Sequence, residues 1–188
     1  MTPSMGLLRW RHVINTHSSW LHGSELGFRS RKHRIHSSGD YNNPPPPGEH
    51  SGLFRYQQAR SSSRVEIPEQ FRGPIGVELI RFFAERKHAL GAMAVMDLHA
   101  HFLVELSESL PAVKAIVGSA KEKVSRLINK QIAGFRWAAG GTFKVVNGQT
   151  HLSTSIEYIL TKQGPGAWTW CPHCGEPSAE RRCPFIHR

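Results

Sequence analysis

Two short apolar runs, joined by Asp97 and Leu98, place the strongest constraint on how this chain folds. The first run is GAMAVM and the second lies within DLHAHFLVEL, and runs of this length with so short a link predict a tight β-hairpin. In a strand, side chains two positions apart point to the same side. We therefore expect His99 and His101 to share one open face of a sheet, while the alternating apolar residues lie against helices on the other face.

The segments around the hairpin predict the rest of the fold. A strand is expected within residues 9–17, then a helix with Pro74 in its first turn, and after the hairpin a second helix capped by Ser109. A strand at TFKVV and a short helix over residues 150–163 complete the order. This order predicts an α+β, ferredoxin-like split βαβ fold, with a central antiparallel sheet, helices packed on one face and the active site on the other.

The composition changes between residues 21 and 68, where Ser, Pro and basic residues dominate. Such a segment buries too little apolar area to form a core element. We therefore expect residues 1–170 to form one domain with a basic, Pro/Ser-rich insertion at 21–68, and residues 171–188 to form a cysteine-containing tail. The insertion either orders on a DNA hairpin or is a disordered basic linker. Its expected DNA contacts are Arg29, Arg31, Lys32 and Arg34.

The formal net charge of +10 at pH 7 favours an anionic partner. A positive field attracts a polyanion, and contacts to phosphates release counterions. Nucleic acid is therefore favoured over an anionic membrane or a basic surface that serves solubility alone. Arg9, Arg11 and His12 interrupt the N-terminal apolar residues, which argues against a secretory signal, and no segment has membrane-spanning length. We expect a cytoplasmic protein without a membrane partner.

Two histidines at this spacing suit a metal site. Neutral imidazoles hold divalent cations, and a bound cation polarises a phosphoryl oxygen during phosphoryl transfer. Two ordinary surface histidines are the alternative. Tyr158 lies in the helical segment SIEYILTKQ, and a phenol can attack a phosphodiester when the phosphate is activated and proton loss is assisted. The alternative is a tyrosine ring that packs with Ile156 or Ile159.

The segment AVMDLHAHFLVEL resembles the metal-binding hairpin of the HUH single-strand nucleases, specifically the REP-associated and related tyrosine transposases. WAAGGTFKV and SIEYILTKQ follow in the order of that family, so the resemblance covers about residues 9–170. It implies that His99 and His101 bind Mg²⁺ or Mn²⁺. It also implies that Tyr158 attacks the scissile phosphate, forming a 5′-phosphotyrosine link and releasing a 3′-hydroxyl. The implied function is a homodimeric transposase that cleaves and rejoins single-stranded or hairpin DNA.

One position departs from the family pattern. Many relatives carry a polar ligand four residues beyond the tyrosine, where this chain has Lys162, and a protonated lysine cannot bind a metal. Gln163 lies about 140° from Tyr158 on an ideal helix, so it serves as a third ligand only if the helix ends or distorts there. The departure supports an alternative, a catalytically impaired DNA-binding protein derived from such a transposase. A replication initiator would share the chemistry. Outside the insertion, the expected DNA contacts are Lys121, Lys144 and Lys162, although a basic helix face is also typical of solvated surface.

The C-terminal tail contains a CPHC pair, Cys171 and Cys174. With Cys183 and His187 it predicts a four-ligand zinc knuckle, because these ligand types suit tetrahedral Zn²⁺. His173 competes as a ligand and a second CxxC pair is absent from the sequence, so a tail without metal is the alternative. We assign this zinc no part in the catalytic step.

Overall fold

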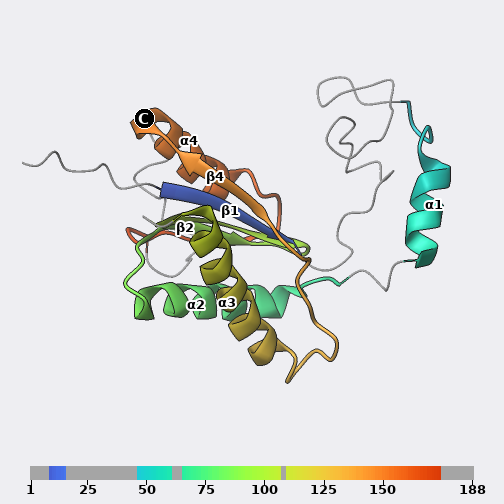
Figure 1. The fold of residues 1–188 in the computed structure, drawn as a ribbon, viewed down its shortest axis with the longest axis horizontal. Coiled ribbons are helices and arrows are strands. Elements are labelled where there is room, and N and C mark those ends of the chain that lie inside the picture. The colour runs from blue at the N-terminus through green and yellow to red at the C-terminus, as the bar shows by residue number, and fades with distance from the viewer. Residues whose placement is uncertain (1–8, 16–45, 61–64, 107–108, 175–188) are drawn as a thin grey trace, which may run out of the picture. The chain divides into compact units, whose positions relative to one another are not determined.

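The computed structural model of the chain describes residues 9–15, 46–60, 65–106 and 109–174 (Figure 1). Contacts divide the chain into two units, the first made of Met1–Thr16 and Glu66–Arg188 and the second of His17–Val65. Among the described helices, none combines the length and the apolar character needed to cross a membrane.

The described part of the second unit contains helix α1 (Ser51–Arg60). It lies inside the segment in which composition predicted no core element, and none of its residues is buried. Its Leu, Arg, Gln and Ala residues are good helix formers, which explains why a helix forms without an apolar stripe. A search for apolar periodicity therefore misses it.

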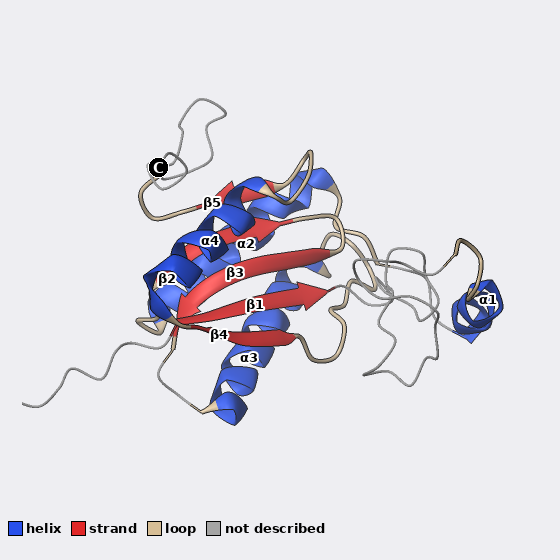
Figure 2. Cartoon of the chain, turned by 90° about the horizontal axis from the view of Figure 1, so that it is seen from above, coloured by secondary structure: helices blue, strands red, loops and turns tan. Residues whose placement is uncertain are grey.

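The first unit is built on a five-stranded sheet of order β4-β1-β3-β2-β5 (Figure 2). All of its strand pairs are antiparallel, and with the helices they confirm the predicted α+β class. The predicted first strand, hairpin and TFKVV strand are present, whereas the last strand was not predicted. The strands are β1 (Arg9–Asn15), β2 (Leu90–Val95), β3 (His99–Glu105), β4 (Thr142–Val146) and β5 (Trp168–Trp170).

Helices α2 (Glu69–Glu85) and α3 (Leu110–Ile128) lie on one face of this sheet (Figure 1). The ring of Phe83 from α2 lies 5.3 Å from the ring of Phe102 on β3, measured between centroids. Ser109 is the N-cap of α3, as predicted. Full burial of each large apolar side chain contributes about 1.5–3 kcal/mol, so this layer provides much of the stability of the unit. The buried apolar residues of α3 are Val113, Val117, Ala120, Val124 and Ile128.

The opposite face of the sheet, which carries the histidines, is covered by helix α4 (Gly148–Thr161). This corrects the prediction that helices pack on one face and leave the other open. The reason lies in β2, where Ala92 and Ala94 alternate with buried residues of the first face, so both faces of the strand are apolar. They form a second core with α4, whose members are Ala92, Ala94, Leu103, Val146, Leu152, Ile156 and Ile159.

Helix α2 begins earlier than the sequence indicated. Its N-cap is Pro68, so Pro74 lies inside the helix instead of in its first turn. Proline has no backbone N–H and cannot bond to the carbonyl four residues before it. Pro74 and Gln70 are both exposed, so the carbonyl without a helical partner belongs to a solvent-exposed part of the helix.

Strand β5 is held by a close contact between Trp168 and Gly76 of α2. A Cβ atom at Gly76 would overlap the indole ring of Trp168. Because glycine has no side chain, the indole ring of Trp168 packs directly against the backbone of α2. The glycine therefore fixes how closely β5 lies against the helix. This contact helps to hold β5, which has only three residues, in its pairing with β2.

We expect Gly76→Ala to lower the free energy of unfolding by about 1–3 kcal/mol through overpacking against Trp168. Thermal unfolding of the full chain measures this loss, because each kcal/mol lowers the midpoint of unfolding by about 2–4 °C. Gly118→Ala in α3 is the matched control, because nothing lies within 4 Å of its added methyl group. That substitution should stabilise the helix by about 0.5–1 kcal/mol. Equal midpoints for the two variants would contradict the close contact.

Candidate active site

The two histidines of β3 form the centre of the candidate site. The hairpin turn is closed by a hydrogen bond in which the Met96 backbone N–H donates to the His99 carbonyl oxygen, 2.8 Å away. Beyond the turn, the imidazole rings of His99 and His101 lie on the same side of the strand, with centroids 4.7 Å apart and ring planes at 84°. His101 is only 7% exposed. The two rings therefore lie on one side of the strand, as predicted, but this side is covered by α4 and not open.

Helix α4 places Tyr158 next to these rings. The centroids of the Tyr158 and His101 rings are 5.6 Å apart, and the ring planes meet at 83°. Ile156 and Ile159 of the same helix are buried in the core under α4, whereas Tyr158 is 40% exposed. The tyrosine thus has its ring at the histidine pair and remains accessible to a substrate.

Gln163 also reaches this site, because α4 ends at Thr161. Lys162 is the C-cap, with φ −108° and ψ 28°, and turns the chain away from the helix axis. The Gln163 amide nitrogen donates a hydrogen bond to the carbonyl oxygen of Tyr158 at 2.8 Å, and its side chain is hydrogen-bonded to His99. Gln163 is buried, and Lys162 is exposed. Gln163 can therefore approach the histidines, because the helix ends before it.

Burial lowers the pKa of His99 below its ordinary value. The carboxylate of Asp97 and the hydrogen bond with Gln163 act in the opposite direction and are weaker. A lowered pKa keeps the imidazole neutral near pH 7, with a lone pair available for a ligand. The sequence predicts Asp97 only as a turn residue, and the structure adds its electrostatic effect on His99. Within the described residues, no group of three His, Cys, Asp or Glu side chains is arranged to hold a metal.

The predicted DNA-contacting lysines are in different environments. Lys144 on β4 and Lys162 at the end of α4 are exposed. Lys121 is half-buried and points from α3 toward the segment before β4, where its ammonium donates to the carbonyl oxygens of Ala138 and Gly140. Arg29, Arg31, Lys32 and Arg34 lie outside the described residues.

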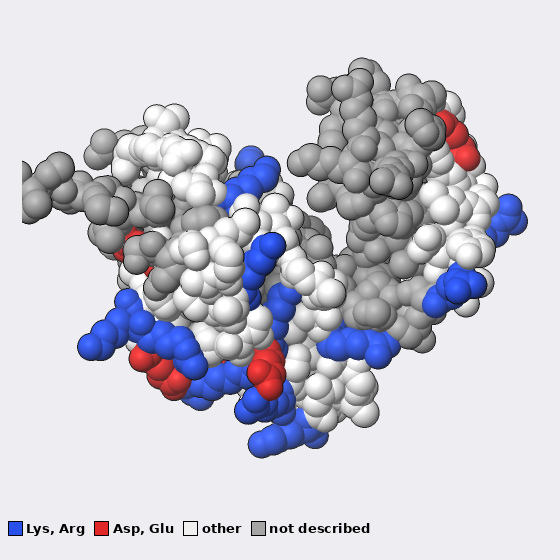
Figure 3. Space-filling view, in the orientation of Figure 1, with Lys and Arg blue, Asp and Glu red and all other residues white. Residues whose placement is uncertain are grey.

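One face of α3 and its C-terminal end carry a basic stripe, part of which is neutralised by acidic partners; its members are Lys114, Lys121, Lys123, Arg126 and Lys130. Lys123 lies 2.9 Å from a carboxylate oxygen of Glu85 and 3.3 Å from one of Glu78, and Arg126 pairs with Glu122. Figure 3 shows acidic side chains among the basic ones on one face of the molecule. The part of the stripe around Lys123 and Arg126 therefore resembles a paired charged surface more than a path for DNA.

The CPHC pair directly follows β5. Cys171 is buried, and its carbonyl oxygen accepts a hydrogen bond from the backbone N–H of Cys174 at 3.2 Å. The turn brings the two residues of the pair close together. Cys183 and His187 lie outside the described residues.

Neither protein-family models nor curated proteins match this chain. Among solved structures, the chain is similar to that of a REP-associated tyrosine transposase bound to a REP hairpin, with 12% sequence identity and a TM-score of 0.43. The alignment covers 81% of this chain and 64% of the other, so the chain spans just under two thirds of that protein's length. The likeness is distant, and we base the function on the side chains of the site.

Proposed function

We propose that this protein is a transposase-type single-strand endonuclease that cleaves and rejoins single-stranded or hairpin DNA with Tyr158 as the nucleophile. One observation carries the proposal. An accessible phenol lies beside His101, 5.6 Å between ring centroids, and His101 in turn lies beside His99. A phenol from α4, two imidazoles from β3 and the amide of Gln163 after α4 meet at this place, and a phenol beside groups that can hold a cation supports nucleophilic attack on a phosphate.

In the proposed reaction, the Tyr158 oxygen attacks the phosphorus of a phosphodiester and its proton passes to solvent. The bond between phosphorus and the 3′ oxygen breaks, and that oxygen takes up a proton and leaves as a 3′-hydroxyl. The product is a 5′-phosphotyrosine. Rejoining reverses the step, because a 3′-hydroxyl then attacks the phosphotyrosine and releases the phenol.

The residues fit a divalent cation, which we propose to be Mg²⁺ or Mn²⁺. His99 and His101 would hold it, and the amide oxygen of Gln163 would be a third ligand. The lowered pKa of His99 favours the neutral form that ligation needs. When bound, the ion would polarise a phosphoryl oxygen and offset charge that develops during transfer. The amide nitrogen of Gln163 donates to the backbone carbonyl of Tyr158, which orients the amide oxygen toward the histidine pair.

Other features of the proposal depend on the same assignment. The strand order β4-β1-β3-β2 supports a ferredoxin-like core, to which β5 adds an edge strand. Exposed Lys144 and Lys162 would contact phosphates near Tyr158. We also propose a homodimer, a domain over residues 1–170 with its insertion at 21–68, and a zinc knuckle in the tail at Cys171, Cys174, Cys183 and His187.

The direction of the covalent link gives a direct test. The protein is incubated with Mn²⁺ and a single-stranded hairpin that is labelled at either its 5′ or its 3′ end. We expect the 3′ label to become covalently attached to protein in a denaturing gel, and the 5′ label to appear in a free fragment. Attachment of the 5′ label would mean the opposite polarity and would overturn the proposed step.

A second function has specific support. Lys162 is exposed at the position where a polar ligand is expected, and no third acidic, cysteine or histidine ligand accompanies the histidine pair within the described residues. These features favour a DNA-binding protein that has lost cleavage. Tight hairpin binding with no adduct in Mg²⁺ or Mn²⁺ would support this second function over the first.

A further inference from the structure

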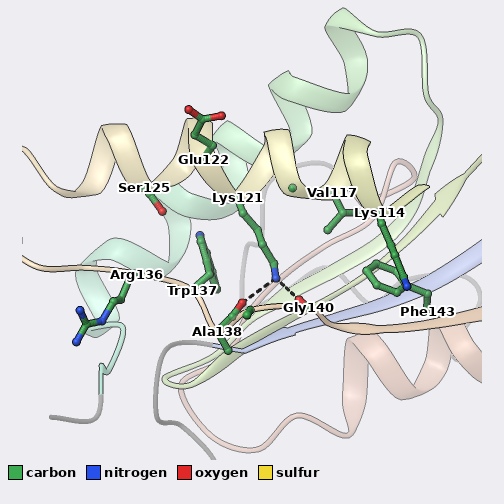
Figure 4. Close-up of a pocket in the computed structure, with 12 residues that line it drawn as sticks. Lys114, Val117, Lys121, Glu122, Ser125, Arg136, Trp137, Ala138, Gly140 and Phe143 are labelled. Atoms are coloured by element: carbon green, nitrogen blue, oxygen red, sulfur yellow. Dashed lines mark hydrogen bonds between the residues drawn. The ribbon is translucent and has the colours of Figure 1, made fainter. Parts of the chain in front are cut away.

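A groove lies on the sheet face away from Tyr158, between α3 and the segment 136–143 that leads into β4 (Figure 4). Its volume is about 450 Å³, within the range of about 300–1,000 Å³ that is usual for ligand pockets. Three cationic side chains and two aromatic ones line it, together with one carboxylate: Lys114, Lys121, Arg136, Trp137, Phe143 and Glu122.

Lys121 provides a cation inside the groove. Its ammonium donates to the carbonyl oxygens of Ala138 and Gly140, and Figure 4 shows it between these two residues. Burial lowers its pKa to about 8, so it stays mostly protonated at pH 7. Because an ammonium has three N–H donors, one is left for an anionic ligand.

Trp137 provides an unused donor in the same place. Its side chain is 9% exposed, and its indole Nε1 is buried with no hydrogen-bond partner in the described part of the chain. The ring is fixed by an edge contact with Phe135, with centroids 5.2 Å apart. Leaving a buried donor without an acceptor is unfavourable, and the indole that carries this donor forms part of the groove wall.

The remaining charges favour an anion. Lys114 reaches down from α3 to the ring of Phe143, as Figure 4 shows. The single lining carboxylate, Glu122, is already paired with Arg126. An anionic ligand in the groove would therefore be attracted by the lysines and repelled little by Glu122.

We infer that this groove binds a segment of single-stranded DNA, with phosphates against Lys114 and Lys121 and a base against Phe143. The choice of polymer rests on the proposed function. Aromatic rings beside cations bind single strands because every base can stack, whereas an acidic peptide would use only the cations.

The position of β4 connects the groove to the site of Tyr158. β4 is an edge strand, and its neighbours Phe143 and Lys144 point to opposite faces of the sheet. Phe143 lines the groove, and Lys144 is exposed on the face that α4 covers. Two strand spacings, about 10 Å, separate the β4 edge from β3 and its histidines. A strand bound in the groove can therefore pass round this edge to reach the nucleophile.

The test measures binding of a fluorescent oligo-dT to the full chain by anisotropy at several salt concentrations. We expect Lys114→Gln to weaken binding about 3–10-fold and to reduce the salt slope by about 0.7, the value for one lost phosphate contact on a single strand. Lys130→Gln, which removes an exposed lysine near the end of α3 outside the groove, should change affinity less than about twofold. Trp137→Phe makes an aromatic wall of the groove smaller and should also weaken binding, with thermal unfolding to verify its fold.

Equal losses for Lys114→Gln and Lys130→Gln would overturn the groove as a site. Displacement of oligo-dT by polyglutamate at the same charge concentration would overturn DNA as its ligand. The oligo-dT binding assay contains no divalent metal and needs no cleavage, so a failure of the cleavage chemistry is distinguished from a failure of the groove.

Discussion

Replacement of Tyr158 by phenylalanine should eliminate the covalent adduct, with a loss of cleavage on the order of 10⁴-fold or more, as is typical for removal of a nucleophile. The variant lacks only the phenolic oxygen and keeps the ring that contacts His101. Because Tyr158 is 40% exposed, its stability should change by no more than about 0.5 kcal/mol. Adduct formation with a 3′-labelled hairpin and Mn²⁺ measures the loss, and hairpin affinity measured without metal should stay near that of the wild type.

The chain itself supplies the controls for this experiment. It has three tyrosines, at positions 41, 56 and 158. Tyr56 is 57% exposed on α1, so Tyr56→Phe makes the same change at another accessible position. We expect it and Tyr41→Phe to cleave normally. An adduct that persists in Tyr158→Phe and disappears in either of the others would assign the nucleophile elsewhere.

The arrangement of the histidines was predictable because it follows from a local rule. Alternation along a strand depends only on backbone geometry, so His99 and His101 had to share a side once β3 was recognised. The length of the two-residue link at Asp97 and Leu98 sets the register of the hairpin, which is also a local property of the chain. No long-range information was needed for either conclusion.

The cover over the histidine face was not predictable in this way. It depends on α4 packing on Ala92 and Ala94, and a short apolar run does not reveal whether one or both faces of its strand are buried. Strand β5 is similar, because its place depends on a glycine in α2 that is distant in sequence. Both are tertiary contacts, and a single-sequence pattern carries little information about them.

The approach of Gln163 lies between these cases. On an ideal helix it points away from Tyr158, and only the end of α4 brings it back. The sequence did contain a stop signal, because Gly164, with φ +83°, and Pro165 follow at once. Such a signal is typical of a helix that ends before the predicted boundary at residue 163, which leaves Gln163 beyond the helix.

Removal of His101 should weaken Mn²⁺ binding by about 100-fold or more, because even partners outside the ligand shell commonly contribute 10–100-fold. Cleavage at a fixed, subsaturating Mn²⁺ concentration should fall in parallel, while hairpin binding without metal stays unchanged. His101→Ala tests this by calorimetric titration with Mn²⁺ and by the adduct assay.

The buried position of His101, 7% exposed, means that His101→Ala also leaves a cavity, so folding has to be separated from ligation. His99→Ala provides that separation, because His99 is only half-buried and should lose metal affinity with a smaller loss of stability. His151→Ala removes an exposed imidazole near the start of α4, the helix that carries Tyr158, and should bind Mn²⁺ like the wild type. Folded His99 and His101 variants that retain wild-type Mn²⁺ affinity would show that the paired rings do not hold the ion. The phosphate would then have to be activated by cations of the chain itself, for which exposed Lys144 and Lys162 are candidates.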